Sequence, residues 1–299
     1  MSDQPEQNDG RGTLWIVATP IGNRADLGDR ARQLLSGVAV IAAEDTRVSR
    51  RLLVPGSTSG TMVSLHEHNE TRMVPELIER LASGDDVALV SDAGTPLISD
   101  PGYRLVNAAH DAGLRVRTVP GPCAAVAALS VSGLACDRFY FEGFLPARSA
   151  RRRRRLSELA GQPDSKIFYA PARDLVAVLA DLADVFGPER QCCLARELTK
   201  RHETVQRLPL GAMAQWVADH DQQQRGEAVL VVAGSERADP AVDIRRLAAE
   251  LKEELPPSRA ARVLARATGL DRQAAWTLIE AGRVDDGAQS AGVAGKPSG

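Results

Sequence analysis

Short apolar runs alternate with amphipathic stretches through the first half of the chain, and this alternation limits the fold more than any other feature. The apolar runs are residues 14–18, 38–43, 86–90 and 114–119. Helical periodicity marks the stretches 72–83 and 102–112 between them. Strands separated by helices of this length need right-handed crossovers, which predict a largely parallel sheet. Because buried parallel strands read as continuous apolar runs, we expect an α/β domain over residues 13–133.

The pattern changes near residue 134. Residues 138–144 (RFYFEGF) alternate aromatic with polar or small residues, which indicates a strand with two different faces. Further strand candidates are residues 166–170, 191–195, 204–207 and 227–233, with helices at 174–184 and 210–219. They predict a second α/β domain over residues 134–236, with antiparallel character and a boundary between 132 and 137.

From Asp243 onward the chain is helical in pattern and rich in alanine. Residues 258–281 predict two helices joined by a short turn at Gly269, capped by Ser258 and Asp271, as in a helix-turn-helix. We expect a small helical extension over residues 243–283, either binding nucleic acid or only packing. It carries five arginines: Arg259, Arg262, Arg266, Arg272 and Arg283. Residues 1–12 and 284–299 are expected to be disordered tails.

Composition excludes several classes of protein. Hydrophobic residues make up 43% of the 299 residues and charged residues 25%, which are ordinary values for a globular protein. No apolar run approaches the roughly twenty residues of a membrane span, and the polar N-terminus lacks a secretory signal. The four cysteines show neither zinc spacing nor a disulfide framework, so no metal and a reducing cytoplasm are expected.

Four loops rich in glycine, proline and small polar residues accompany predicted strands. They are Thr19–Asn23, Ser91–Gly102 (SDAGTPLISDPG), Pro120–Ala125 (PGPCAA) and Arg225–Glu227. Ligands of open α/β sheets bind outside the carboxyl ends of the strands, and glycine lets a backbone approach a ligand closely. We therefore expect the first three of these loops, all in the first half of the chain, to converge on one site.

The expected ligand is cationic or zwitterionic. Neither GxxxxGK[ST] nor GxGxxG follows the first predicted strand, so ATP, GTP or NAD held in the usual way is not expected. The loops after the predicted parallel strands offer carbonyls, amides and Asp92 but no basic side chain. S-adenosylmethionine, with a sulfonium and an amino-acid end, fits such a set.

Several strings of the sequence resemble one enzyme family. They are LWIVATPIGN, IAAEDTR, LHEHNE, ALVSDAGTPLISDPGYRLV, VPGPCAAVAALSVSGL, RFYFEGFLP, ARELTK, HET and RGE. Together they resemble the ribosomal RNA small subunit methyltransferase I family, within the tetrapyrrole-methylase-like class. The resemblance implies two α/β domains with the cofactor cleft between them, a homodimer, and S-adenosylmethionine as cofactor. It also implies 2′-O-methylation of the ribose of cytidine 1402 in 16S rRNA, within the assembled small ribosomal subunit.

The resemblance also implies which residues bind the cofactor. They are Pro20, Asp92, Ala93, Gly94, Thr95, Pro96, Cys123, Ala124, Tyr169, Ala195 and Gly226. One segment departs from the family. Where the family usually has a glutamate after Phe-Tyr and then a His-Arg pair, this chain has Ala170 and, three residues later, Arg173.

Candidates for moving the proton of the ribose hydroxyl are Glu197, Lys200 and His66, with Glu67, Asp92 and Glu142 as further candidates. Glu197 and Lys200 are three residues apart and would pair on a helical turn, where a buried lysine with a lowered pKa could accept a proton. An ordinary surface ion pair is the alternative. His66-Glu67-His68 lacks the spacing of a zinc helix, so a polar loop facing the substrate is expected instead.

Arginine dominates the positive charge and is expected to grip RNA. The net charge is −2, yet only four of the 37 basic residues are lysine. The planar guanidinium donates two hydrogen bonds at once to a phosphate. The expected RNA contacts are Arg47, Arg50, Arg148, Arg151, Arg152, Arg153, Arg154 and Arg155, the last five forming a continuous run. A solvated charged loop is the alternative for this run.

Two other functions fit parts of the sequence. A methyltransferase acting on a tetrapyrrole or another small molecule would share the loops but would not need the arginine run. A DNA-binding regulator would use residues 258–281 but would leave the loops of the first 230 or so residues unexplained.

Overall fold

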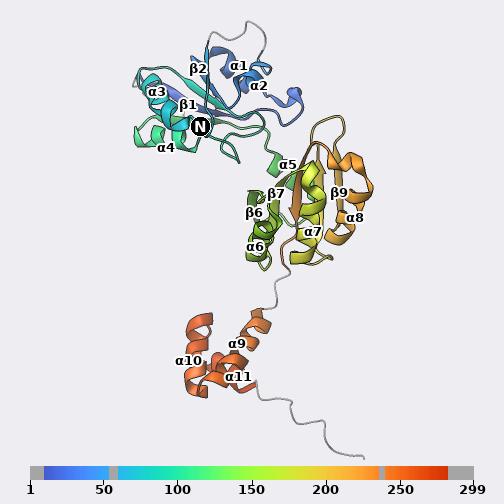
Figure 1. Ribbon diagram of the computed structural model, residues 1–299. Coiled ribbons are helices and arrows are strands. Elements are labelled where there is room, and N and C mark those ends of the chain that lie inside the picture. The colour runs from blue at the N-terminus through green and yellow to red at the C-terminus, as the bar shows by residue number, and fades with distance from the viewer. Residues whose placement is uncertain (1–9, 54–59, 236–239, 282–299) are drawn as a thin grey trace, which may run out of the picture. The chain divides into compact units, whose positions relative to one another are not determined.

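The computed structural model describes residues 10–53, 60–235 and 240–281, and the chain divides between Gly234 and Ser235 into two compact units. The first unit contains two five-stranded sheets with their helices, and the second contains three helices (Figure 1). Residues 1–9 and 282–299, which include Arg283 and most of both expected tails, lie outside the described residues.

The first sheet is parallel throughout, as predicted. Its strands, in spatial order, are β3 (Thr61–Ser64), β2 (Val40–Ala43), β4 (Val87–Val90), β1 (Thr13–Val17) and β5 (Arg115–Val119). Helices α3 (Glu70–Ala82) and α4 (Tyr103–Asp111) pack on one face, and α1 (Asp29–Gly37) packs on the other. Alternate residues of β2 point into these two cores, because side chains alternate along a strand. Strand β3 and the short helix α2 (Thr46–Arg50) were not predicted.

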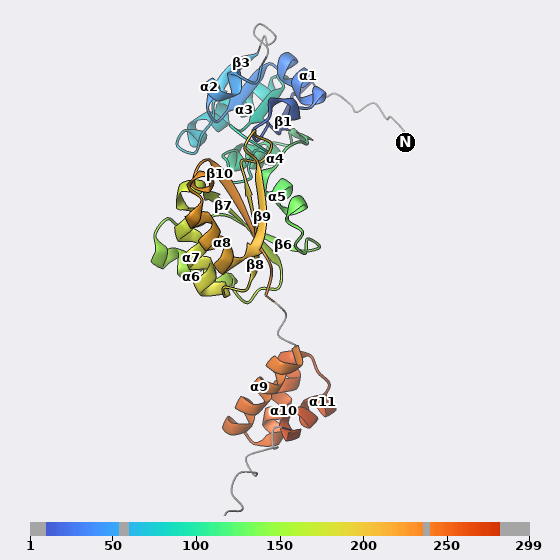
Figure 2. The ribbon, with the colours of Figure 1, turned by 90° about the vertical axis from the view of Figure 1, so that its right-hand side faces the viewer.

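The second sheet is mostly antiparallel. Its strands, in spatial order, are β6 (Phe139–Phe144), β7 (Ser165–Pro171), β10 (Glu227–Val232), β8 (Gln191–Arg196) and β9 (Thr204–Pro209). Only the β6–β7 pair is parallel. Helices α6 (Ser149–Leu159), α7 (Leu175–Phe186) and α8 (Leu210–Asp219) cover one face, and α5 (Ala124–Ser132) covers the other (Figure 2). Helix α5 therefore packs on the second sheet, although it begins before the expected domain boundary at 132–137.

The arginine run lies on helix α6, so the charged loop that was the alternative for this run is not present. Arg152 is buried, and its guanidinium donates to Asp181 of α7 at 2.6 and 2.7 Å. The Ser149 hydroxyl donates to the same carboxylate at 2.9 Å. Burial of a charge is costly unless it is paired and hydrogen-bonded, so this cluster joins α6 to α7.

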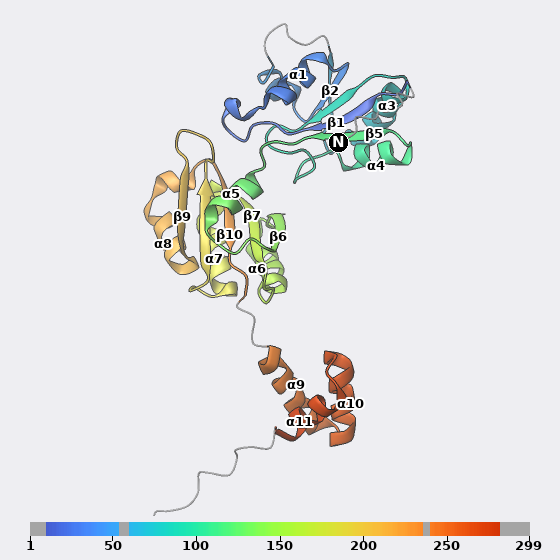
Figure 3. The same ribbon diagram turned by 180° about the vertical axis from the view of Figure 1, so that it is seen from behind.

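The second unit is a three-helix bundle made of α9 (Pro240–Glu254), α10 (Pro257–Thr268) and α11 (Arg272–Ala281) (Figure 3). Its small core contains Ala260, Leu264 and Ile279. The Asp271 side chain accepts from the backbone N–H groups of Gln273 and Ala274, which confirms the predicted cap of α11. The predicted cap Ser258 is wrong: α10 is preceded by Pro256 and starts on Pro257, whose fixed φ suits a first helical position.

Removing the carboxylate under Arg152 should destabilise the first unit. Asp181→Ala leaves a buried guanidinium without its partner, which costs about 3–5 kcal/mol for a buried pair. We expect the unfolding midpoint of this unit to drop by on the order of 10 °C in differential scanning calorimetry. Arg154→Ala on the exposed side of the same helix is the control and should change little. Equal midpoints for Asp181→Ala and wild type would contradict the structural role.

Candidate active site

Three loops at the carboxyl ends of the first sheet are bonded to one another. Thr19 and Gly94 form an isolated antiparallel bridge, with N–H···O distances of 2.8 and 3.1 Å. The Thr95 hydroxyl donates to the Pro122 carbonyl at 2.9 Å. These bonds connect the loops after β1, β4 and β5, which confirms that the three predicted loops converge.

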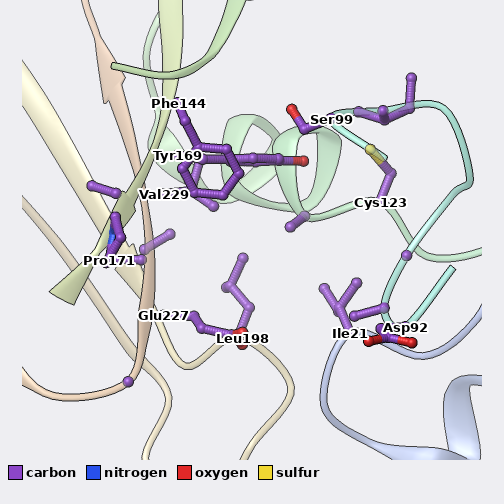
Figure 4. A pocket seen from close by; sticks show the side chains of 18 of the residues that line it. Ile21, Asp92, Ser99, Cys123, Phe144, Tyr169, Pro171, Leu198, Glu227 and Val229 are labelled. Atoms are coloured by element: carbon purple, nitrogen blue, oxygen red, sulfur yellow. The ribbon is translucent and has the colours of Figure 1, made fainter. Parts of the chain in front are cut away.

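A cavity of about 580 Å³ lies between these loops and the second sheet. Figure 4 shows Ile21 and Asp92 from the first sheet's loops on the same cavity as Leu198, Tyr169 and Glu227 from the second. The predicted residues that line it are Asp92, Ala93, Gly94, Thr95, Cys123, Ala124, Tyr169, Ala195, Gly226, Glu197 and Lys200. Pro20, Pro96 and His66 were predicted in the site but are not among the lining residues.

Acidic side chains gather on the first-sheet side of the cavity. Glu44, Asp92 and Asp100 all line it. Burial raises the pKa of Glu44 and of Asp92, and it raises the pKa of Asp100 to about 6, with further increases from the neighbouring carboxylates. The Asp92 carboxylate also accepts from the Asp45 backbone N–H at 3.0 Å. A cationic ligand would relieve the repulsion within this group.

Lys200 lies between two carboxylates on the second-sheet side. Its ammonium donates to Glu197 at 2.9 Å and to Glu227 at 2.7 Å. Burial lowers the pKa of Lys200, but these two hydrogen bonds outweigh it and leave the pKa raised. The interpretation of Lys200 as a base with a lowered pKa is therefore wrong, because a second carboxylate, Glu227, which is distant in sequence, pairs with the ammonium. The segment is a tight turn rather than a helix.

Glu197 is held as a carboxylate. Burial raises its pKa, while the Lys200 ammonium and the backbone N–H of Glu227, at 2.9 Å, lower it more. A Cβ at Gly226 would lie 2.3 Å from the Glu197 Oε1 atom, and Gly226 has a φ of +89°. Only glycine therefore lets the backbone of the Arg225–Glu227 loop lie against this carboxylate.

Backbone strain is concentrated beside the cavity. Among the described residues, the non-glycine residues with positive φ are Leu97, Ser99, Glu197 and Thr199. Ser99 and Glu197 line the cavity, and the other two lie within two residues of them. Such conformations cost on the order of 1–3 kcal/mol each and persist only where the surroundings impose them, which is typical of functional sites.

An aromatic wall closes one side of the cavity. Tyr169 makes edge-to-face contacts with Phe141 and Phe144, with ring centroids 5.1 and 5.4 Å apart. Burial raises the pKa of the Tyr169 phenol, so this group stays protonated. The cavity extends past Tyr169 to Arg173, whose side chain is 82% exposed at the segment that departs from the family pattern.

The remaining proton-transfer candidates lie away from the cavity lining. His66 is partly buried, and its Nδ1 atom has no hydrogen-bond partner among the described residues. Glu67 is exposed. Glu142 accepts from the Arg155 guanidinium at 2.7 Å, which makes it a structural partner of α6. Among the described residues, no group of three His, Cys, Asp or Glu side chains is placed to hold a metal ion.

The arginines predicted to contact RNA differ in their exposure and in their ion pairs with carboxylates. Arg152 is buried, Arg155 is paired with Glu142 and Glu158, and Arg153 is paired with Asp181 and Asp184. Arg148, Arg151 and Arg154, here called the outer arginines, are exposed. In the part of the chain that the structure describes, their one ion pair is a 3.9 Å contact from Arg154 to Glu158. Arg47 is 85% exposed and pairs with Asp45, whose pKa it lowers to about 2. Arg50 is exposed.

Sequence reasoning missed several residues of the cavity. They are Ile21, Glu44, Ile98, Ser99, Asp100, Phe144, Ala170, Pro171, Arg173, Leu198, Glu227, Ala228 and Val229. Asp100 and Ser99 lie within a loop that was already singled out, and Glu44 directly follows a buried strand. Counting every residue of that loop would have included Ser99 and Asp100, and counting the residue after each buried strand would have included Glu44.

Family models match two parts of the chain. Residues 13–214 match the model of tetrapyrrole (corrin/porphyrin) methylases, and residues 238–276 match the model of the RsmI C-terminal helix-turn-helix domain. Solved structures agree on the fold: the methyltransferase CobJ aligns with a TM-score of 0.55 at 21% identity, covering 75% of this chain and 95% of that one. Uroporphyrin-III-C-methyltransferase from Thermus thermophilus aligns with a TM-score of 0.52 at 22% identity, covering 75% and 94%. The fold and the cavity thus define a tetrapyrrole-methylase-class protein.

Curated relatives narrow the assignment. A ribosomal RNA small subunit methyltransferase I from Xylella fastidiosa is 51% identical, covering 89% of this chain and 98% of that protein. Those from Pseudomonas aeruginosa and Escherichia coli O157:H7 are 49% and 43% identical, covering 87% and 92% of this chain and 93% and 97% of those proteins. The chain belongs to the ribosomal RNA small subunit methyltransferase I family, as its motifs predicted. None of the described helices is both long and apolar enough to cross a membrane.

Asp100 should make the stability of the first unit depend on pH. Its pKa is raised from 3.8 to about 6 in the folded chain, so the folded state binds the proton more tightly than the unfolded state does. Stability is therefore lost as pH rises from about 4 to about 6 and does not return above it. Asp100→Asn removes this penalty, and we expect a stabilisation on the order of 1 kcal/mol at pH 7 after allowing for solvent screening.

The measurement is the thermal midpoint of both proteins at several pH values. The difference between Asp100→Asn and wild type should grow across that window and then stay constant. Asp26→Asn, on an exposed turn outside the cavity, is the control and should show no such growth. A constant difference at every pH would contradict the raised pKa.

Proposed function

We propose that the chain transfers the methyl group of S-adenosylmethionine to the ribose 2′-oxygen of cytidine 1402 in 16S rRNA. The observation that carries this proposal is the single cavity formed by three interlinked loops of the first sheet and the turn at Glu197–Lys200. The curated relatives are named as methyltransferases of ribosomal RNA of the small subunit, and the site chemistry agrees with that name.

The cavity fits the cofactor by size and by charge. A volume of about 580 Å³ is within the range of small-molecule sites. The carboxylates near Asp92 suit a sulfonium or an ammonium, and the apolar wall around Tyr169 suits the nucleoside. One solved structure of the same fold, a uroporphyrin-III C-methyltransferase, is titled as a complex with S-adenosylhomocysteine, the product form of this cofactor.

The protein mainly has to align the acceptor and take up its proton. S-adenosylmethionine, when bound, supplies an already activated methyl group. Alignment in a closed cleft lowers a barrier by several kcal/mol, up to about 7–11, and a positioned base adds roughly 10²–10⁴-fold. Glu197, ionised and facing the cavity, is the proposed proton acceptor. Lys200 stays protonated, and its ammonium stabilises negative charge on the ribose 2′-oxygen. His66 has no role in this proposal.

In this proposal, exposed arginines bind the phosphate groups of the RNA. Arg151 and Arg154 lie on α6, and Arg148 directly precedes this helix, which begins five residues after Phe144 at the cavity wall. Arg151 and Arg154 are one helical turn apart and free of short ion pairs among the described residues. We add Arg50, which is exposed. We leave out Arg47, Arg152, Arg153 and Arg155, because the guanidinium groups of these four residues are paired with carboxylates.

Recognition of one cytidine requires more than this basic surface. Sequence-specific recognition of RNA depends on folded shape and unstacked bases, which supports the assembled small ribosomal subunit as substrate. We also propose a homodimer and a cytoplasmic location, where that substrate is found.

The deciding experiment offers the protein labelled S-adenosylmethionine with either 30S subunits or uroporphyrinogen. We expect label on the RNA, in a ribose that resists alkaline cleavage after methylation. Label on the porphyrin alone would overturn the assignment in favour of a tetrapyrrole methyltransferase, the function suggested by the shared fold.

Asp92 should attract the cofactor by charge. Asp92→Asn keeps the shape of the side chain but removes a negative charge from the cavity. We expect S-adenosylmethionine to bind about tenfold more weakly in calorimetry, which corresponds to about 1.4 kcal/mol. Asp26→Asn is the control for the loss of one carboxylate outside the cavity. Unchanged affinity in Asp92→Asn would remove this residue from the cofactor site.

The outer arginines should set the salt dependence of RNA binding. Replacing Arg151 and Arg154 by serine removes two phosphate contacts, so the slope of log affinity against log salt should fall by about 1.4 for single-stranded RNA. Arg153→Ser removes charge from the same helix but from a residue already paired with Asp184, and should change the slope less. Equal slopes for the double variant and wild type would show that α6 does not touch RNA.

A further inference from the structure

Helix α10 of the second unit carries three arginines and no acidic residue (Pro257–Thr268). All three, Arg259, Arg262 and Arg266, are exposed. At about 100° per residue they fall within an arc of about 60° on one face of the helix. We call this face the α10 arginine face.

The core of the bundle fixes the direction of this face. Ala260, Ala261 and Leu264 of α10 are buried, and they lie roughly opposite the arginines around the helix axis. The helix cannot rotate to hide the arginines without exposing that core. No hydrogen bond or ion pair involving the three guanidinium groups is found among the described residues, so none of those residues neutralises their charge.

The other helix of the helix-turn-helix is different. The exposed residues of α11 include Arg272, Gln273, Trp276 and Glu280, so its surface has one positive and one negative charge. In a DNA-reading helix-turn-helix, the second helix enters the groove and supplies the base contacts. In this bundle the charge that attracts phosphate lies on the first of the two helices instead.

We propose that the α10 arginine face binds the phosphate backbone of RNA, and that α11 is not the main contact. The inference rests on the proposed function in that it takes the partner to be RNA. Guanidinium groups match phosphate oxygens in a two-pronged geometry, and all three basic residues of this helix are arginine. Contacts of this kind position a nucleic acid without reading its sequence.

The test uses the full-length protein and a short single-stranded RNA, with binding followed by fluorescence anisotropy at several salt concentrations. The variant is Arg259→Gln, Arg262→Gln and Arg266→Gln together. We expect binding at least tenfold weaker at low salt and a slope of log affinity against log salt lower by about 2. The control replaces three exposed arginines elsewhere, Arg72, Arg138 and Arg272, by glutamine and removes the same charge.

Three outcomes would overturn the proposal. Wild-type affinity in the α10 variant would mean that this face does not contact RNA. Equal losses in the variant and the control would mean that only net charge matters. Binding of the wild type to anionic phosphatidylglycerol vesicles but not to RNA, lost in the variant, would identify a lipid surface as the partner.

The same preparations separate this inference from the proposed function. Circular dichroism and calorimetry with S-adenosylmethionine should give wild-type results for the α10 variant, since the cavity lies in the other unit. If the wild type methylates 30S subunits and the variant binds RNA normally, the α10 inference alone fails. If the wild type binds RNA through α10 but methylates no ribose, the proposed function alone fails.

Discussion

The backbone pairing between Thr19 and Gly94 is the interaction on which the cavity depends. It joins loops that follow β1 and β4, strands adjacent in the sheet but separated by about 70 residues of sequence. Thr19 is fully buried, and its hydroxyl donates to the Ser91 carbonyl at 3.1 Å, so both loops are held by bonds that water does not reach. With these loops held, Asp92, Thr95 and Cys123 face one space rather than three separate turns.

The two sides of that space differ in charge. The loops of the first sheet supply carboxylates whose pKa values burial raises, and no basic side chain is among the described lining residues of that side. On the second-sheet side, Lys200 and Arg173 balance the carboxylates of Glu197 and Glu227. A donor with a positive centre is therefore favoured beside the first sheet's carboxylates, whereas a phosphate-bearing cofactor would meet repulsion from Asp92 and Asp100.

Sequence reasoning predicted what depends on local pattern and missed what depends on distant partners. The apolar runs predict the parallel sheet. The loops rich in glycine and proline that follow these runs are predicted to converge, because the carboxyl ends of parallel strands meet at one edge of the sheet. The sign of the pKa shift of Lys200 did not follow, since Glu227 is far along the chain. The burial of Arg152 was not predicted, for the same reason: its carboxylate partner is on α7, and nothing near the run in sequence indicates which arginine side chain is buried.

Helices α6 and α10 show that counting arginines does not measure affinity for phosphate. In α6, three of the five guanidinium groups of the run form ion pairs with Glu142, Asp181 and Asp184. These ion pairs join α6 to α7 and β6. In α10 the side chains opposite the arginines are alanine and leucine, which offer nothing to pair with. An arginine is available to bind RNA only when its own fold gives it no carboxylate. Among the described residues, α10 therefore presents three arginines without such a partner, whereas the run of five presents only Arg151 and the weakly paired Arg154.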